Sequence, residues 1–124
     1  MSREREIKNA RIESTMLGTE DHGIFTAYVM LDYGGSGQGF GGYALDTWVG
    51  PRDGTGARRG TAYGMQWVIE VCRVVGVTKW EDLKGKHVRV DADFGKIYRI
   101  GHIIKDVWFD PAQLLTEEKE LADA

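Results

Sequence analysis

Cysteine, proline and long apolar runs are all scarce in this sequence of 124 residues. The single cysteine, Cys72, cannot form an internal disulfide, which excludes a disulfide-stabilised scaffold and favours a reducing compartment. The longest apolar runs, such as residues 28–31, have four or five residues, whereas a membrane-spanning helix needs about 20. The charged N-terminal segment, residues 1–6, leads into no apolar signal core, so we expect a protein that is not exported.

An excess of one charge sign is also missing from most of the chain. Sixteen basic residues face 19 acidic ones, for a net charge of −3. Residues 116–124 alone carry four acidic side chains and one basic one, so the remaining residues are balanced. Proteins that coat long nucleic acids usually show a clear basic excess, which argues against that class. A compact phosphate ligand held by two or three arginines stays compatible with this balance.

Glycine is abundant, with 17 residues, and six of them fall within residues 34–42. Gly37, Gly39 and Gly42 match the spacing of a dinucleotide-binding fingerprint, but an extended Tyr43-Ala44-Leu45 follows where that motif needs a helix. The lysine and hydroxyl of a phosphate-binding P-loop are also missing. We therefore expect a bent, twisted strand in which large neighbours pack over bare backbone, with close approach of a ligand as the alternative.

Periodicity predicts a mixed fold. Alternating patterns indicate antiparallel strands at residues 7–17, 24–33, 87–92 and 96–107, with Gly101 as a bulge. In the first of these strands, Ile12, Ser14 and Met16 should share one face. A short helix is expected at residues 112–121.

Residues 61–75 form the one long helix that the sequence predicts. Thr61 should cap its start and Gly76 should end it. Its predicted core-facing stripe consists of Met65, Val68, Ile69, Cys72 and Val75. A second apolar strip, formed by Trp67, Val71 and Val74, indicates that another subunit covers the opposite side.

Together these elements predict a single α+β domain over residues 1–124. An antiparallel sheet of about four to five strands carries one main helix and a short C-terminal helix. Residues 1–6 and 117–124 are expected to fray, and residues 47–60 are expected to form a long glycine-rich loop.

Residue types needed for catalysis are not grouped. His22, His87 and His102 are far apart in sequence, without the spacing of a metal site. Ser36 lies in a Gly-Ser-Gly sequence that lacks the spacing of a nucleophile elbow. We therefore predict no enzyme activity, no metal and no cofactor.

Groups suited to binding an anionic ligand are present instead. Arg58 and Arg59 precede the main helix, whose N-terminus favours anions. Arg89, Lys96 and Arg99 add cations along two strands, and aromatic residues near them offer stacking surfaces. Each charge alone also fits a solvated strand face, but the combination indicates a site. The predicted ligand-binding residues are Tyr43, Arg58, Arg59, Arg89, Asp91, Asp93, Lys96 and Arg99.

Several segments carry a resemblance to a known family. Residues 12–18 (IESTMLG), 21–25 (DHGIF) and 34–46 (GGSGQGFGGYALD), with later residues 85–90 (GKHVRV) and 100–111 (IGHIIKDVWFDP), resemble the phage sponge proteins that antagonise the Thoeris defence. Residues 47–59 are longer and richer in glycine than expected from that family.

The resemblance implies a phage anti-defence protein that sequesters a cyclic ADP-ribose isomer, made by a bacterial TIR-domain sensor, without degrading it. It also implies binding of cyclic oligonucleotides by some members, a homo-oligomer built on dimers with pockets shared between subunits, and action in the cytoplasm of the infected bacterial host. The alternative prediction is a phage inhibitor that binds a host defence protein directly, which the acidic C-terminal segment favours. A small nucleotide hydrolase is the third hypothesis, against which the absence of a catalytic set counts.

Overall fold

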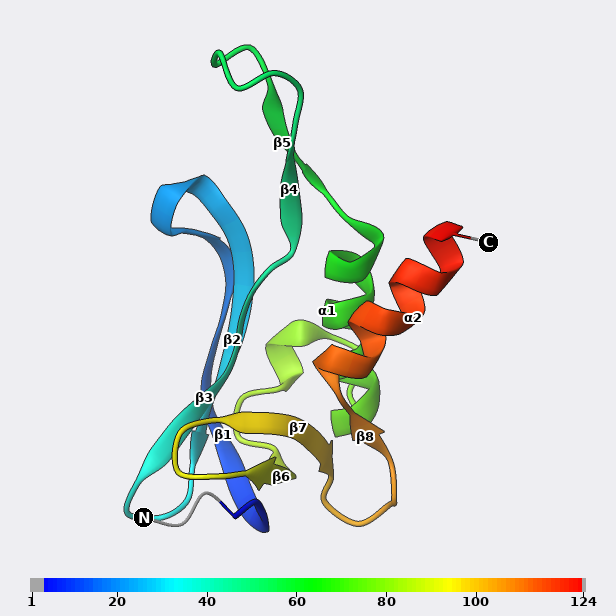
Figure 1. The fold of residues 1–124 in the computed structure, drawn as a ribbon. Helices are drawn as coiled ribbons and strands as arrows, with labels where there is room; N and C mark the ends of the chain where they lie inside the picture. Colours follow the sequence, from blue (N-terminus) through cyan, green and yellow to red (C-terminus); the bar gives the residue numbers. More distant parts are fainter. Residues whose placement is uncertain (1–3, 124) are drawn as a thin grey trace.

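The computed structural model describes residues 4–123, in which an antiparallel sheet lies beside two helices (Figure 1). Along the sheet the strand order is β3-β2-β1-β6-β7-β8, and a second sheet contains β4 and β5. The elements are β1 (Glu6–Glu20), β2 (Ile24–Asp32), β3 (Gly37–Ala44), β4 (Asp46–Val49), β5 (Ala57–Gly60), α1 (Ala62–Val75), β6 (His87–Ala92), β7 (Ile97–His102), β8 (Trp108–Phe109) and α2 (Pro111–Asp123). The predicted α+β class is therefore confirmed, although the main sheet has six strands rather than four or five.

A long hairpin of β1 and β2 forms the middle of the main sheet, and the predicted antiparallel pairing is confirmed. The pairing shifts between Ile12 and Ser14, which places a bulge in β1. Ile12 pairs with the buried Leu31, whereas Ser14 pairs with Met30 on the other face. The prediction that Ile12, Ser14 and Met16 share a face was therefore wrong, because the bulge resets the alternation.

Helix α1 has the predicted ends. The Thr61 hydroxyl accepts a hydrogen bond from the Gly64 N–H, and Gly76 adopts a left-handed φ of 91° just beyond the last turn. The predicted core-facing stripe was wrong for most of its members, however. Val75 is buried and Val68 packs partly buried against the core, but Met65 and Ile69 are exposed and Cys72 is only partly buried. The other buried residues of the helix are Gly64, Trp67, Val71 and Val74.

A close backbone contact explains which face α1 turns toward the sheet. A Cβ atom at Gly64 would overlap the Leu45 carbonyl oxygen, so only glycine permits this approach. Trp67 lies one turn further along the same face and stacks on Phe40, with ring centroids 5.6 Å apart. Phe109 meets the Trp67 ring edge-on at 5.8 Å, which joins α1, β3 and β8 in one aromatic core.

The chain turns back earlier than predicted after β7. His102 ends this strand, and its Nδ1 atom accepts the N–H groups of Ile104 and Lys105 at 3.0 Å. Trp108 and Phe109 then pair with β7 as β8, so the strand predicted over residues 96–107 is wrong in its second half. Gly101 is paired regularly with Arg89 and Trp108, and the register shift lies between Asp91 and Ala92 instead.

Two segments predicted to be irregular are ordered elements. Residues 47–60 contain most of the β4–β5 hairpin, which projects from the body of the molecule (Figure 1) and is called the arm, residues 46–60, below. Residues 117–123 belong to α2, and β1 begins at Glu6. Residues 1–3 and 124, for which fraying was also predicted, lie outside the described residues.

Candidate functional site

A buried carboxylate organises the end of the sheet formed by β6 and β7. Asp91 on β6 is only 6% exposed and receives two hydrogen bonds from Arg5, at 2.9 and 2.8 Å. The Arg99 Nε donates a third, at 2.7 Å. The hydrogen bonds from Arg5, reinforced by the one from Arg99, hold the pKa of Asp91 below its usual value despite the opposing effect of burial.

Two arginines flank one tryptophan ring beside this carboxylate. The guanidinium carbons of Arg89 and Arg99 lie 4.9 and 4.3 Å from the centre of the Trp108 ring. Arg89 is fixed by hydrogen bonds to the carbonyl oxygens of His102 and Lys105, at 2.8 and 2.7 Å. The ring packs over Gly101, where a Cβ atom would approach it to 2.6 Å. Glycine at position 101 therefore lets the ring pack on the strand within reach of both cations.

A second ring is arranged in a similar way at the β6–β7 turn. The Arg5 guanidinium and the Lys96 ammonium lie 4.2 and 5.0 Å from the centre of the Tyr98 ring. The Tyr98 hydroxyl donates to Asp93 at 2.6 Å, and Asp93 also accepts the backbone N–H groups of Gly95 and Lys96. Asp93 therefore shapes the turn that carries Lys96.

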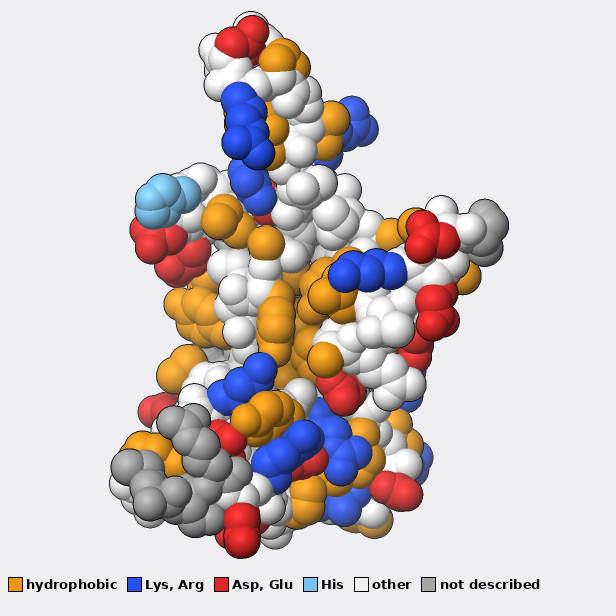
Figure 2. Space-filling model, in the orientation of Figure 1, with side chains coloured by type: hydrophobic (Ala, Val, Ile, Leu, Met, Phe, Trp, Pro, Cys, Tyr) orange, Lys and Arg blue, Asp and Glu red, His pale blue; other side chains and the backbone are white. Residues whose placement is uncertain are grey.

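We call this surface the cation–aromatic cluster; its members are Arg5, Arg89, Lys96, Arg99, Tyr98 and Trp108. Four cations face three carboxylates, those of Asp91, Asp93 and Asp106, the last of which accepts the Trp108 indole N–H at 3.1 Å. The local charge is therefore +1, in a chain whose net charge is −3. Lys and Arg side chains gather on the lower part of the face in Figure 2, over β7. This concentration of positive charge beside aromatic rings suits an anionic ligand with a planar group.

Five of the eight predicted site residues lie together at this end of the sheet: Arg89, Asp91, Asp93, Lys96 and Arg99. The other three lie elsewhere. Arg58 and Arg59 belong to β5 in the arm, which projects from the opposite end of the molecule (Figure 1). Tyr43, on β3, contacts Trp67 with ring centroids 6.2 Å apart, and burial raises the pKa of its hydroxyl.

Arg58 and Arg59 differ in their surroundings although they are neighbours. Arg58 donates two hydrogen bonds of 2.9 Å to the Asp46 carboxylate. These hydrogen bonds hold the pKa of Asp46 below its usual value. Arg59 is exposed, and the described residues offer its guanidinium no hydrogen bond or ion pair. Arg58 therefore fixes the root of the arm, while the Arg59 guanidinium is available to a partner.

Two members of the cluster, Arg5 and Trp108, are not among the residues that the sequence predicts for the site. Arg5 belongs to the segment predicted to fray, but the pairing of Ile7 with Asp91 brings it to that carboxylate. Such pairing joins residues 84 positions apart, and no local pattern encodes it. The signal for Trp108 was the small residue at position 101, which makes room for a large ring on the neighbouring strand.

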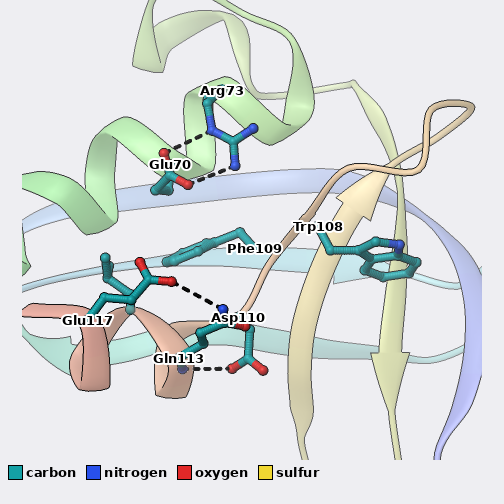
Figure 3. A pocket seen from close by; sticks show the side chains of 8 residues that line it. Glu70, Arg73, Trp108, Phe109, Asp110, Gln113 and Glu117 are labelled. Carbon is teal, nitrogen blue, oxygen red and sulfur yellow. Dashed lines mark hydrogen bonds and ion pairs between the residues drawn. The ribbon is translucent and has the colours of Figure 1, made fainter.

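A cleft of about 200 Å³ lies between α1 and α2 beside this cluster. Figure 3 shows Glu70 and Arg73 projecting into it from α1 and Gln113 and Glu117 from α2, with dashed lines joining each pair. Asp110, which caps α2, adds a third carboxylate against one arginine. The cleft therefore has the wrong charge for a phosphate ligand, and the cation–aromatic cluster is the better candidate for one.

Two further observations concern residues 4–123. Within them, no group of three or more His, Cys, Asp or Glu side chains is arranged to hold a metal ion. No helix in that range is long and apolar enough to cross a membrane.

No protein-family model matches the sequence, and no curated protein or solved structure is significantly similar to it.

Proposed function

We propose that this protein binds a small cyclic nucleotide and sequesters it without degrading it. The proposed ligand is a cyclic ADP-ribose isomer, with cyclic oligonucleotides as further candidates. The proposed setting is the cytoplasm of a phage-infected bacterial host, where removing this signal would block an immune response. The proposal also includes a homo-oligomer, either a dimer or an assembly of dimers.

The observation that carries this proposal is the pair of arginines against the Trp108 ring. Arg99 donates through Nε to Asp91, while its Nη nitrogens have no hydrogen-bond partner among the described residues. These free N–H groups can donate to phosphate oxygens, and the adjacent indole can stack on a base. Because Asp91 and two backbone carbonyls already hold the guanidinium groups in place, little side-chain entropy is lost on binding.

The same geometry favours binding over chemistry. The two buried carboxylates, Asp91 and Asp93, are fully used in hydrogen bonds to arginines, a tyrosine and backbone N–H groups. The low pKa of Asp91 keeps it ionised at neutral pH, so it accepts hydrogen bonds but is a poor general acid or base.

Calorimetric titration with cyclic ADP-ribose isomers and with cyclic di- and trinucleotides tests the proposal. We expect tight binding of at least one of them, and recovery of the unchanged ligand when the complex is heated. Lys96→Gln should weaken binding at least tenfold, the usual loss for one charged hydrogen bond. Lys79→Gln, which removes an exposed lysine that is not a member of the cluster, is the matched control. A chemically altered ligand would identify an enzyme, and no heat across the whole panel would reject the proposal.

Direct inhibition of a host defence protein is the second candidate function. It is favoured by the arm, whose apolar side chains Trp48 and Val49 are 42% and 48% exposed. A projecting hairpin with exposed apolar groups is a common means of contacting another protein. This candidate predicts a stable complex with a host protein and no affinity for nucleotides.

A further inference from the structure

An uncovered apolar groove lies at the base of the arm. Leu17 and Phe25 of the β1–β2 hairpin, Leu45, and Met65 and Val68 of α1 line this base groove. Met65 is 65% exposed, and Ile69, one turn further along the helix, is 47% exposed. These positions belong to the face of α1 that the sequence predicted to point inward, so its apolar character is left without a partner within the chain.

The arm, like the groove, lacks a packing partner within the described chain. Its two strands pair with each other but with no other strand, and a lone two-stranded hairpin is marginally stable in water. Trp48 packs on Gly56 within the arm, yet it remains 42% exposed and Val49 remains 48% exposed, because the arm projects away from the body (Figure 1). Covering these two side chains with an apolar surface on another molecule would therefore stabilise the arm.

Charge on the two regions is also complementary. The arm carries three arginines against Asp46 and Asp53, a net charge of +1. Arg52 and Arg59 are exposed, and neither has an ion-pair partner among the described residues. Glu20 and Asp21 lie at the tip of the β1–β2 hairpin, a few residues from Leu17 and Phe25 in the base groove. A basic arm entering an apolar groove would therefore meet an acidic rim.

We propose that two copies of this chain associate by placing each arm in the base groove of the other copy. A second copy fits better than a different protein because one chain carries both complementary surfaces, the arm and the base groove. A two-fold axis satisfies both at once, because each copy supplies one arm and one groove. Association through the arm needs no ligand, so it can succeed or fail independently of the proposed nucleotide binding.

The mass of the full-length protein in solution, measured by light scattering and sedimentation, tests the proposal. We expect twice the chain mass of 13.9 kDa for the native protein. Met65→Lys, which puts a charge into the groove at a position where lysine suits a helix, should give the single-chain mass. Ile104→Lys, at an 83% exposed residue outside both surfaces, is the control and should keep the doubled mass.

A crosslink identifies the contact itself. In a Cys72→Ala background, Val49→Cys combined with Met65→Cys should form a disulfide between chains, seen as a doubled mass without reductant. A native protein that stays monomeric at about 100 µM, far above the Kd of a specific interface of standard size, would overturn the proposal and leave the arm for a different protein. A doubled mass that persists in Met65→Lys, with no crosslink, would overturn it as well, because association would then use another surface.

Discussion

The cation–aromatic cluster and the arm are both rich in arginine, yet they hold their arginines in different ways. In the cluster, Arg5, Arg89 and Arg99 are each fixed by a carboxylate, a carbonyl oxygen or an aromatic ring. In the arm, only Arg58 is fixed, while Arg52 and Arg59 extend into solvent. Figure 2 shows blue side chains in both regions, so charge alone does not distinguish them.

This difference in how the arginines are held indicates where a rigid binding surface can form. The cluster lies on paired strands of the main sheet, and a buried carboxylate orients its cations before any ligand arrives. The arm has no core of its own, so its free cations suit a contact that orders on association. Substitutions in the cluster should therefore lower stability more than substitutions in the arm, and the two sets should also differ in their effect on binding.

Asp91→Ala should have the largest effect on stability. It removes three hydrogen bonds to two arginines and leaves their charges unpaired, at a cost of about 2–4 kcal/mol in the free energy of unfolding. Urea denaturation followed by circular dichroism measures it. Asp53→Ala, which removes an exposed carboxylate near the tip of the arm, is the control. Equal losses from the two variants would contradict the contrast between the regions.

Gly101→Ala should have the second-largest effect, lowering the free energy of unfolding by about 1–3 kcal/mol. The added methyl group would approach the Trp108 ring to 2.6 Å, so the ring must move off Arg89 and Arg99. Denaturation measures the stability, and near-ultraviolet circular dichroism reports the displaced indole. Gly60→Ala is the matched control in the arm, because a Cβ atom there meets nothing within 4 Å. An unperturbed indole signal in Gly101→Ala would show that the ring is not confined in this way.

Acid should remove the contribution of Asp91 gradually. Because the folded pKa of Asp91 is lowered, the carboxylate stabilises the fold above its usual pKa of about 4, and this stabilisation is lost as the pH falls through the folded value. The difference in unfolding free energy between the native protein and Asp91→Asn should therefore be constant near pH 7 and shrink below about pH 4. A difference that grows on acidification would contradict the assigned direction.

Arg59→Ala should have the smallest effect on stability, within about 0.5 kcal/mol, since its guanidinium has no partner in the described chain. The Arg59→Ala variant should instead associate into dimers more weakly than the native protein. Sedimentation across a range of concentrations measures this. A stability loss as large as that of Asp91→Ala would show that the arm is held as firmly as the cluster.

Local sequence patterns predicted the elements that depend on neighbouring residues. The Thr61 cap, the Gly76 stop and the β1–β2 hairpin are examples, and all three are confirmed. The features that the sequence did not predict depend on contacts between residues far apart in the chain. Met65 was predicted to face the core because apolar periodicity does not reveal which of two faces a close contact at Gly64 will select.

The candidate site was predicted in part for the same reason. Arg89, Asp91 and Arg99 lie on two strands joined by a short turn, so sequence proximity was enough to group them. Arg5 reaches Asp91 through the pairing of β1 with β6, which no local pattern encodes. Arg58 and Arg59 precede α1, as read from the sequence, but the arm carries them away from the cluster.

Indole signals in a nuclear magnetic resonance titration test the central claim most directly. The chain has four tryptophans, of which Trp108 reports on the cluster and Trp48 on the arm. On addition of a cyclic ADP-ribose isomer, the account predicts a large shift of the Trp108 indole N–H and little change at Trp48. A shift confined to Trp48, or no shift at any indole at millimolar ligand, would contradict it.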